Sequence, residues 1–328
     1  MKEVDEVLGA LDAAPYGLSI PEIMARANVS KGRIDKTLQL LSLEAPSPVR
    51  KEGSKWILTG TKLPDSFWER ARRLTDLRRE EQAHMQEYVS LEAGHMEFLI
   101  SALDGDPVNF QPPKLSPLPT DANPTLVQGA ITFLQRTSLD LEPRRMWPTG
   151  GLSNLGVSGR IPPALQARPG KILCNWGDAG WGHLVQQGKL VDNHYADALV
   201  EACAAMYRTW NPQPAPTWVA CIPSKRQPRL VLEFGQRLAK ALRLGFYHVV
   251  SMVEERPPQK TMANSNQQAS NIDGALAVRQ KLPPGPMLLV DDTVDSRWSM
   301  TVAAYLIAAD GSGPVHPLVL ASAQFADD

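Results

Sequence analysis

Two adjacent carboxylates, Asp291 and Asp292, stand between an apolar run and a loop rich in hydroxyl groups. The run at residues 287–290 predicts a buried parallel strand, because a strand covered on both faces needs no polar alternation. Open α/β sheets bind ligands at the carboxyl ends of such strands. The apolar residues from Val302 onward predict a helix, whose first amides and dipole favour a phosphate. This order predicts a site for a phosphorylated sugar, with the carboxylates facing ribose hydroxyls or a Mg²⁺ shell.

The stretch from residue 287 to residue 299 resembles the phosphoribosyl-pyrophosphate (PRPP) signature of type I phosphoribosyltransferases. That signature has four hydrophobic residues, two acids, two spacers and a T-[ST]-G-x-[ST] loop, and Arg297 stands here at the position of its glycine. Glycine permits a tight turn close to phosphate, whereas a guanidinium can either add charge to the site or close it by its bulk. The resemblance implies that Asp295, near the anomeric carbon, is the candidate catalytic residue. It also implies that PRPP, with Mg²⁺, binds at Asp291, Asp292, Ser296, Arg297, Trp298 and Ser299.

Two earlier segments follow the same family pattern in the correct order. Residues 223–226 match the first-strand loop that holds pyrophosphate in the family, which implies this role for Ser224, Lys225 and Arg226. Residues 256–275 look like the flexible loop of the ComF-like branch, in which an arginine, a Pro-Gln pair and a later Asn-x-x-Gly-Ala recur. In active members this loop closes over the reacting sugar and excludes water. The resemblance therefore implies loop functions for Arg256, Gln259 and Asn271.

The elements that must position these residues alternate between strand and helix over residues 216–328. Such alternation predicts an α/β domain, a phosphoribosyltransferase-like parallel sheet flanked by helices. Residues 126–215 are predicted to form a small mixed α/β connecting domain that ends in an amphipathic helix at residues 195–210. In the last domain, the sequence predicts a helix at residues 231–242 and strands at residues 218–222, 246–250, 287–290 and 318–321.

Residues 1–62 carry the pattern of an N-terminal winged helix. Apolar residues at helical spacing predict a first helix, Ser19 is the candidate cap of a second, and Ser30 that of a third. Two apolar runs around Gly53 predict the hairpin that forms the wing. In a DNA reader the third helix enters the major groove and the wing contacts the backbone. The candidate DNA-binding residues are Lys31, Arg33, Lys36, Arg50, Lys51 and Lys55.

An alternative use of the same domain is protein contact, with these lysines as solvated surface. Asp35, Glu44 and Glu52 dilute the positive charge of the patch. Two segments follow the winged helix. Residues 63–104 are predicted to be a charged helical segment, and residues 105–125 are rich in proline, which is typical of an extended linker.

The resemblance extends over nearly the whole chain. The winged helix, the helical segment that contains Gly94 and His95, the blocks at residues 144–150 and 178–182, and the ComF-like domain follow one order. That order is similar to the region downstream of the two motor lobes in certain bacterial RecQ-type DNA helicases. The motor lobes are absent from this sequence, and the helical segment is a degenerate zinc-binding region because Gly94 replaces its first cysteine. We therefore expect neither unwinding by this chain alone nor a zinc site, since one histidine without thiolates cannot close a tetrahedral site.

Composition sets further limits on function. The net charge of −1 leaves only a local patch for any nucleic-acid contact. The absence of G-x-x-x-x-G-K-[ST] from the sequence excludes P-loop ATP hydrolysis. The three cysteines, Cys174, Cys203 and Cys221, are widely spaced and are predicted to be buried free thiols. The first residues carry no apolar signal region and no run reaches transmembrane length, so we expect a cytoplasmic protein without membrane contact.

Two hypotheses from different classes remain open. The first is a DNA-associated accessory protein that acts with a RecQ-type helicase or another DNA-processing partner and binds PRPP or a nucleotide. The second is a Mg²⁺-dependent phosphoribosyltransferase that transfers phosphoribose from PRPP to a base or an amine. Such a transfer passes through an oxocarbenium-like state and needs positioning more than a nucleophile. Arg297 in the phosphate loop and the missing motor favour the first hypothesis.

Overall fold

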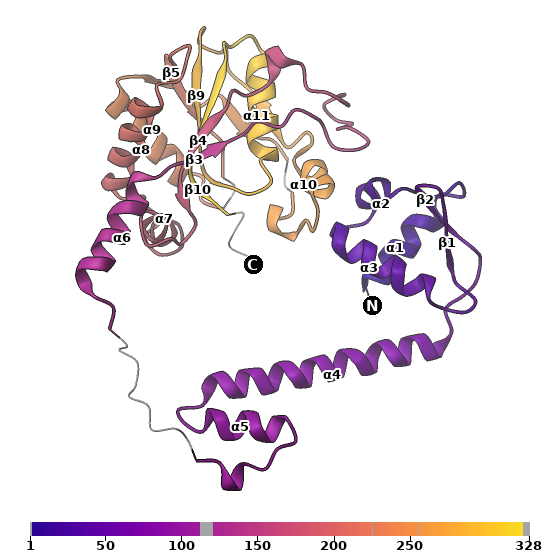
Figure 1. Cartoon of the computed structure of the whole chain (residues 1–328). Coiled ribbons are helices and arrows are strands. Elements are labelled where there is room, and N and C mark those ends of the chain that lie inside the picture. The colour runs from indigo at the N-terminus through magenta and orange to yellow at the C-terminus, as the bar shows by residue number, and fades with distance from the viewer. Residues whose placement is uncertain (1, 112–120, 225, 255, 324–328) are drawn as a thin grey trace. The chain divides into compact units, whose positions relative to one another are not determined.

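The computed structural model describes residues 2–111, 121–224, 226–254 and 256–323. The chain divides into two compact units, residues 1–17 with 35–122 and residues 18–34 with 123–328. Figure 1 draws both units and labels most of their helices and strands.

The first unit consists of helices and one β-hairpin. The hairpin strands pair antiparallel, and Gly53 between them has a φ of 58°, which glycine adopts at no steric cost. These helices and strands lie at the residues where the sequence predicts them. Its elements are α1 (Lys2–Asp12), most of α3 (Lys31–Ser42), β1 (Val49–Glu52), β2 (Lys55–Leu58), α4 (Asp65–Ser90), α5 (His95–Ala102) and the short turn η1 (Pro107–Asn109).

The second unit carries the remaining helices and strands. Its first helix, α2 (Ile20–Arg26), begins after Ser19, whose amide donates a hydrogen bond to the Glu22 carboxylate at 2.8 Å. The sequence predicted this cap. The elements of residues 123–328 are α6 (Pro124–Arg136), β3 (Leu139–Leu141), η2 (Pro163–Leu165), β4 (Gly170–Asn175), α7 (Gly182–Gln187), the π-helical turn η3 (Gly188–Asp192), α8 (Asp197–Trp210), β5 (Trp218–Cys221), α9 (Leu230–Leu242), β6 (Gly245–Phe246), β7 (Val250–Met252), η4 (Gln259–Thr261), α10 (Ser265–Ile272), β8 (Leu276–Val278), β9 (Met287–Val294), α11 (Trp298–Ala309) and β10 (Val315–Ser322).

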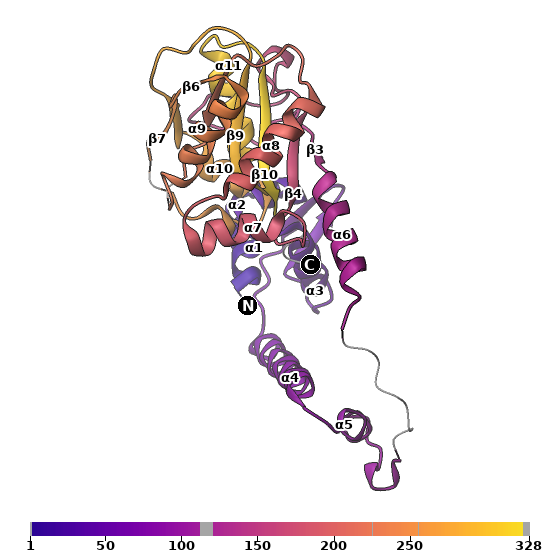
Figure 2. The same ribbon diagram turned by 90° about the vertical axis from the view of Figure 1, so that its left-hand side faces the viewer.

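Six strands form the central sheet of the second unit, in the order β3-β4-β10-β9-β5-β6 (Figure 2). β3 is antiparallel to β4, and the other neighbours are parallel. β7 and β8 form a separate antiparallel pair. The prediction of an α/β architecture with a mostly parallel sheet between helices is confirmed.

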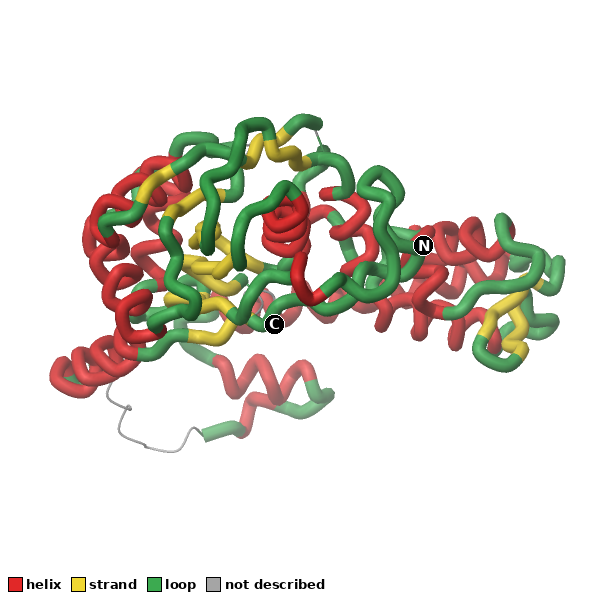
Figure 3. The backbone as a smooth tube through the Cα atoms, turned by 90° about the horizontal axis from the view of Figure 1, so that it is seen from above, coloured by secondary structure: helices red, strands yellow, loops and turns green. Residues whose placement is uncertain are grey.

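Helices cover both faces of this sheet, whose strands are yellow between red helices in Figure 3. Leu288 and Val290 of β9 pack among α7, α8 and α9 on one face. Met287 and Leu289 pack among α10 and α11 on the other. Because successive strand residues point to opposite faces, both faces demand apolar side chains. This double burial explains why residues 287–290 show no polar alternation.

Two predicted strands need correction. The strand expected at residues 246–250 is divided between β6 and β7, which belong to different sheets. β5 offers β6 partners only at Trp218 and Val219, so the chain leaves the sheet after Phe246. The strand expected at residues 287–290 continues to Val294, because β10 pairs with it as far as the partners Ser322 and Val294.

The predicted boundary between residues 215 and 216 falls within one sheet. β4, from the segment before that boundary, pairs in parallel with β10, from the segment after it. Residues 112–120 of the predicted proline-rich linker lie outside the described residues. Cys174, Cys203 and Cys221 are buried free thiols, as predicted. Among the described helices, none combines the length and apolar character needed to cross a membrane.

Gly235 tests the contact between α9 and the sheet. A Cβ atom at this position would lie 2.2 Å from the Sγ of Cys221 in β5, so Gly235→Ala should overpack the interface and cost about 1–3 kcal/mol of unfolding free energy. Gly129→Ala on α6 is the matched control, because a Cβ there meets nothing within 4 Å, and it should stabilise by up to about 1 kcal/mol. Urea unfolding followed by tryptophan fluorescence measures both; equal stability of the two variants would contradict this packing.

Candidate functional site

The strand order reverses between β5 and β9. The chain leaves β5 through α9 on one face of the sheet and leaves β9 through α11 on the other. Such a reversal opens a crevice at the carboxyl ends of the two strands, which is where open α/β sheets bind ligands. The predicted pyrophosphate loop follows β5 and the predicted phosphate loop follows β9, so both predicted loops start at this crevice.

Asp291 and Asp292 lie within β9 and not on the loop after it. β5 pairs with β9 only as far as Cys221 and Val290. β10 continues alongside on the other edge, where Val319 is the partner of Asp291. At the two acids, β9 is therefore no longer paired with β5, the strand on the crevice side.

The Asp292 carboxylate is buried and fully engaged by other side chains. Its Oδ1 accepts hydrogen bonds from the Nζ of Lys189 and the Oγ1 of Thr293, both at 3.0 Å. Its Oδ2 accepts one from the Oη of Tyr195 at 2.9 Å and also lies 3.0 Å from the Nζ of Lys189. Burial, and then the charge of Asp292, raise the pKa of Tyr195, so its hydroxyl stays protonated and donates. Lys189 and Tyr195 carry no sequence signal, because they lie about a hundred residues before the acid they contact.

Asp291 differs from its neighbour. Its side chain is half-buried, and its Oδ1 accepts a hydrogen bond from the amide of Asp292 at 2.8 Å. Desolvation and, after it, the negative charge of Asp292 raise its pKa well above the usual range, against the opposing charge of Lys189. Perturbed carboxylates in a crevice are characteristic of binding and catalytic sites.

The predicted phosphate loop, residues 295–299, contains a backbone conformation that favours glycine. Arg297, at the glycine position of the resembling motif, adopts the left-handed conformation with φ 67° and ψ 3°. Its guanidinium turns away to donate from Nη1 to the carbonyl of Glu142 at 2.9 Å. Of the two possibilities that the sequence left open for this arginine, added charge or steric closure, the geometry shows a third, an anchor for the loop. Left-handed backbone at a non-glycine residue costs about 1 kcal/mol or more, so the surrounding structure must enforce the turn.

Arg144 is the second anchor of this loop. Its Nε donates to the carbonyl of Ser296 at 2.8 Å, and its guanidinium lies 4.0 Å from the ring centroid of Trp298. Desolvation, and then the charge of Arg297, lower its pKa to about 10, still well above neutrality. The Trp298 side chain is 2 % exposed and stacks on Trp147. Because the Trp298 ring is part of the core, only the backbone amide of this residue remains for the predicted contact with a ligand.

The remaining loop residues differ in exposure. Asp295 is exposed and accepts from the Nε2 of Gln268 at 3.4 Å. Ser296 and Ser299 are half-buried. The first amides of α11 have no partner within the helix, which leaves them available to an anion.

The loop after β5 is joined to the Asp292 network. Ser224 is half-buried, Arg226 is exposed, and Lys225 lies outside the described residues. The Nε2 of Gln227 donates to the carbonyl of Lys189 at 2.6 Å. A cavity of about 390 Å³ opens beside this loop, with Ser224, His248 and Glu254 among its lining residues.

The predicted flexible loop is held by its own side chains. The Nδ2 of Asn271 donates to the Oε1 of Gln259 at 2.8 Å and to the carbonyl of Pro257 at 3.0 Å. Arg256 donates to the carbonyl of Asp273 at 3.2 Å and pairs with Glu254. The structure thus brings Gln259 and Asn271 together, and Gln268 links the same segment to Asp295.

The six candidate DNA-binding side chains are all exposed. Lys31, Arg33 and Lys36 lie on α3, and Arg50, Lys51 and Lys55 on the β1–β2 hairpin. Arg50 pairs with Glu52, and the Nζ of Lys51 lies 5.8 Å from the centroid of Trp56.

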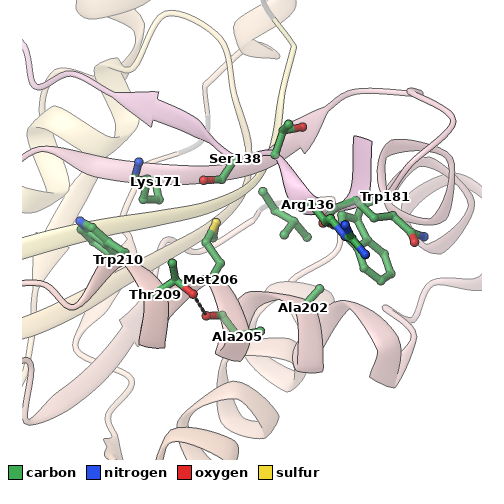
Figure 4. Close-up of a pocket in the computed structure, with 12 residues that line it drawn as sticks. Arg136, Ser138, Lys171, Trp181, Ala202, Ala205, Met206, Thr209 and Trp210 are labelled. Carbon is green, nitrogen blue, oxygen red and sulfur yellow. Dashed lines mark hydrogen bonds between the residues drawn. The ribbon is translucent and has the colours of Figure 1, made fainter. Parts of the chain in front are cut away.

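A further cavity of about 410 Å³ lies between the β3–β4 edge and α8. Figure 4 shows Trp181 and Trp210 at its two ends, with Lys171 and Ser138 above Met206 and Thr209. The Nζ of Lys171 bonds the Oδ1 of Asp140 at 2.6 Å. No residue predicted from the sequence lines this cavity, and the predicted loops begin instead at the strand-order reversal between β5 and β9.

Among the described residues, no group of three or more His, Cys, Asp or Glu side chains is placed to hold a metal ion. Comparison with known proteins gives few matches. No family model and no curated protein matches this chain. Among solved structures, it is similar to an adenine phosphoribosyltransferase from Leishmania tarentolae, with 16% identity, a TM-score of 0.26, and coverage of 38% of this chain and 69% of that one.

Asp291 gives a pH-dependent test of the crevice. Because its folded-state pKa is raised, its contribution to stability is complete below the usual pKa of about 3.9 and is lost as pH rises through the folded value. Asp291→Asn should therefore unfold at a higher temperature than the wild type at neutral pH, and this gain should shrink toward acidic pH. Calorimetric unfolding over a pH series measures it, with the exposed Asp295→Asn as control. A gain that is independent of pH would contradict the raised pKa.

Proposed function

We propose that residues 123–328 bind a ribose 5-phosphate group, as part of PRPP or a nucleotide, in the crevice between β5 and β9. One observation carries this proposal: the acid-bearing strand, the left-handed loop and the start of α11 follow one another at the reversal of strand order. In this arrangement Asp291 accepts hydrogen bonds from ribose hydroxyls. The backbone of residues 296–299 and the hydroxyls of Ser296 and Ser299 hold the phosphate.

In the bound state, Ser224 and Arg226 supply a donor and a positive charge to a pyrophosphate at C1. Arg144 and Arg297 anchor the loop and do not contact the phosphate, since each donates to a main-chain carbonyl. We propose ligand binding as the function ahead of phosphoribosyl transfer. The candidate catalytic residue, Asp295, is exposed, whereas transfer requires a sugar enclosed from water.

Isothermal calorimetry with PRPP and Mg²⁺ tests the site. The wild type should release or absorb heat at millimolar ligand, and Asp291→Asn should weaken binding about tenfold or more, the loss expected when a charged hydrogen-bond acceptor is removed. Arg243→Ala is the control, because this residue is the C-cap of α9, at the helix end opposite the β5 loop. Pyrophosphate release in the presence of a panel of bases would establish transfer as well. Absence of heat in the wild type would contradict the proposal.

We propose a winged helix for residues 1–62, with α3 as the element that enters the groove of duplex DNA. The exposure of the six basic side chains on α3 and the hairpin supports this role. An associated helicase or another DNA-processing protein would then supply the motor, and the sugar-phosphate site would make the assembly responsive to nucleotide precursors.

A mobility shift on duplex and forked DNA tests the nucleic-acid contact. The double substitution of Arg33 and Lys36 to Ala should weaken binding to all sequences and lower the slope of log K against log salt by about 2, because two phosphate contacts are lost. Changing the exposed Lys240 and Lys281 to Ala removes the same net charge elsewhere and should leave binding unchanged. Equal effects of both double substitutions would contradict the assignment of α3 as the DNA-contacting element.

A further inference from the structure

Lys189 occupies the place that a divalent cation would need at the acid pair. Its Nζ is 3.0 Å from each carboxylate oxygen of Asp292 and 2.8 Å from the Oγ1 of Thr293. It also lies 5.8 Å from the ring centroid of Trp176. With the Tyr195 hydroxyl on Oδ2, the carboxylate has donors on both oxygens.

The backbone around Lys189 is built to hold it there. Lys189 is the second residue of the π-helical turn η3, and π-helical turns occur frequently at functional sites. Gly188 permits the close approach, because a Cβ atom there would lie 2.7 Å from the carbonyl oxygen of His194 and 2.9 Å from the Tyr195 ring. The Gln227 side chain fixes the carbonyl of Lys189 from the β5 loop. The ammonium is therefore set in position from two sides of the crevice.

Mg²⁺ does not fit at Asp292 in this arrangement. The ion requires oxygen ligands in near-ideal octahedral geometry and keeps several waters. At Asp292 it would meet an ammonium within hydrogen-bond distance of both oxygens, and a carboxylate that is 5 % exposed. Two cations at such a separation repel strongly in a protein interior.

We propose that Lys189 replaces the metal ion at the acid pair, so that the crevice binds a ribose 5-phosphate group without a protein-held divalent cation. The part of this claim that concerns the ligand rests on the proposed function; the part that concerns the metal stands on the Lys189 contacts alone. The two acids then have different roles: Asp292 forms the ion pair with Lys189, and Asp291 binds the ribose hydroxyls. Any Mg²⁺ that accompanies PRPP is then held by the pyrophosphate of the ligand and by water.

Mn²⁺ alone, followed by its electron paramagnetic resonance signal, tests the metal claim. The wild-type protein and Lys189→Arg should leave Mn²⁺ free, since both keep a cation on Asp292. Lys189→Met exposes the carboxylate to the metal and should gain a site. Lys189→Met combined with Asp292→Asn, which leaves no buried unpaired charge, should lose that site again. Wild-type Mn²⁺ binding that disappears in Asp292→Asn would overturn the proposal, as would a folded Lys189→Met variant that binds none.

Calorimetry with ribose 5-phosphate, which lacks a pyrophosphate to carry a metal, tests the ligand claim. The wild type should bind equally well in EDTA and in Mg²⁺, within about twofold, and Lys189→Met should bind at least tenfold better in Mg²⁺ than in EDTA. A wild-type affinity that rises tenfold with Mg²⁺ would overturn the proposal even if Lys189→Met fails to fold. No binding under either condition would refute the proposed ligand, while the Mn²⁺ measurement would still decide the role of Lys189.

Discussion

A buried carboxylate must be neutralised, and in this protein that requirement shapes the whole crevice. Asp292 is almost fully buried on a central strand, and removal of one partner from such a pair typically costs about 3–5 kcal/mol. The π-helical turn, the protonated Tyr195 and the glycine beside Lys189 all serve to bring an ammonium to that carboxylate. Lys189 and Tyr195 therefore meet Asp292 from about a hundred residues earlier in the sequence, and the β5 loop joins them through Gln227.

The same constraint separates the two acids into different chemical roles. Asp292 is saturated by its own chain, whereas Asp291 is half-buried with a raised pKa beside a strand edge that β5 has vacated. The two adjacent acids thus differ in their surroundings: the Asp292 carboxylate is saturated by its own chain, and the Asp291 side chain is only half-buried. The loop after β9 is held by two arginines, because Arg144 donates to the carbonyl of Ser296 and Arg297 donates from the loop to the carbonyl of Glu142.

Much of the fold could be predicted from residue pattern. The unalternating run at residues 287–290 indicated a strand buried on both faces, and Ser19 with Glu22 indicated a helix start. The extent of β9 could not be predicted, because it depends on how far β10 runs beside it. The sequence also could not show that strands from both sides of residue 216 belong to one sheet, since β4 and β10 pair across well over a hundred positions.

The contacts of the predicted site residues could not be read from the sequence. Arg297 was visible as a departure from glycine, yet its left-handed backbone and its turn toward Glu142 depend on neighbours that no local pattern reveals. Trp298 resembled a loop residue and is a core aromatic, because Trp147 and Arg144 cover its ring. Lys189 carried no motif, and only the folded chain shows that it reaches Asp292.

A crystal structure of the protein grown with ribose 5-phosphate in the presence of EDTA would test the central claim most directly. We expect electron density for the phosphate against residues 296–299 and for the ribose hydroxyls against Asp291, with the Lys189–Asp292 contact intact. Density for the ligand elsewhere, such as the cavity between Trp181 and Trp210, would contradict the assigned site. A ligand bound at β9 with Lys189 withdrawn from Asp292 would contradict the role given to that lysine.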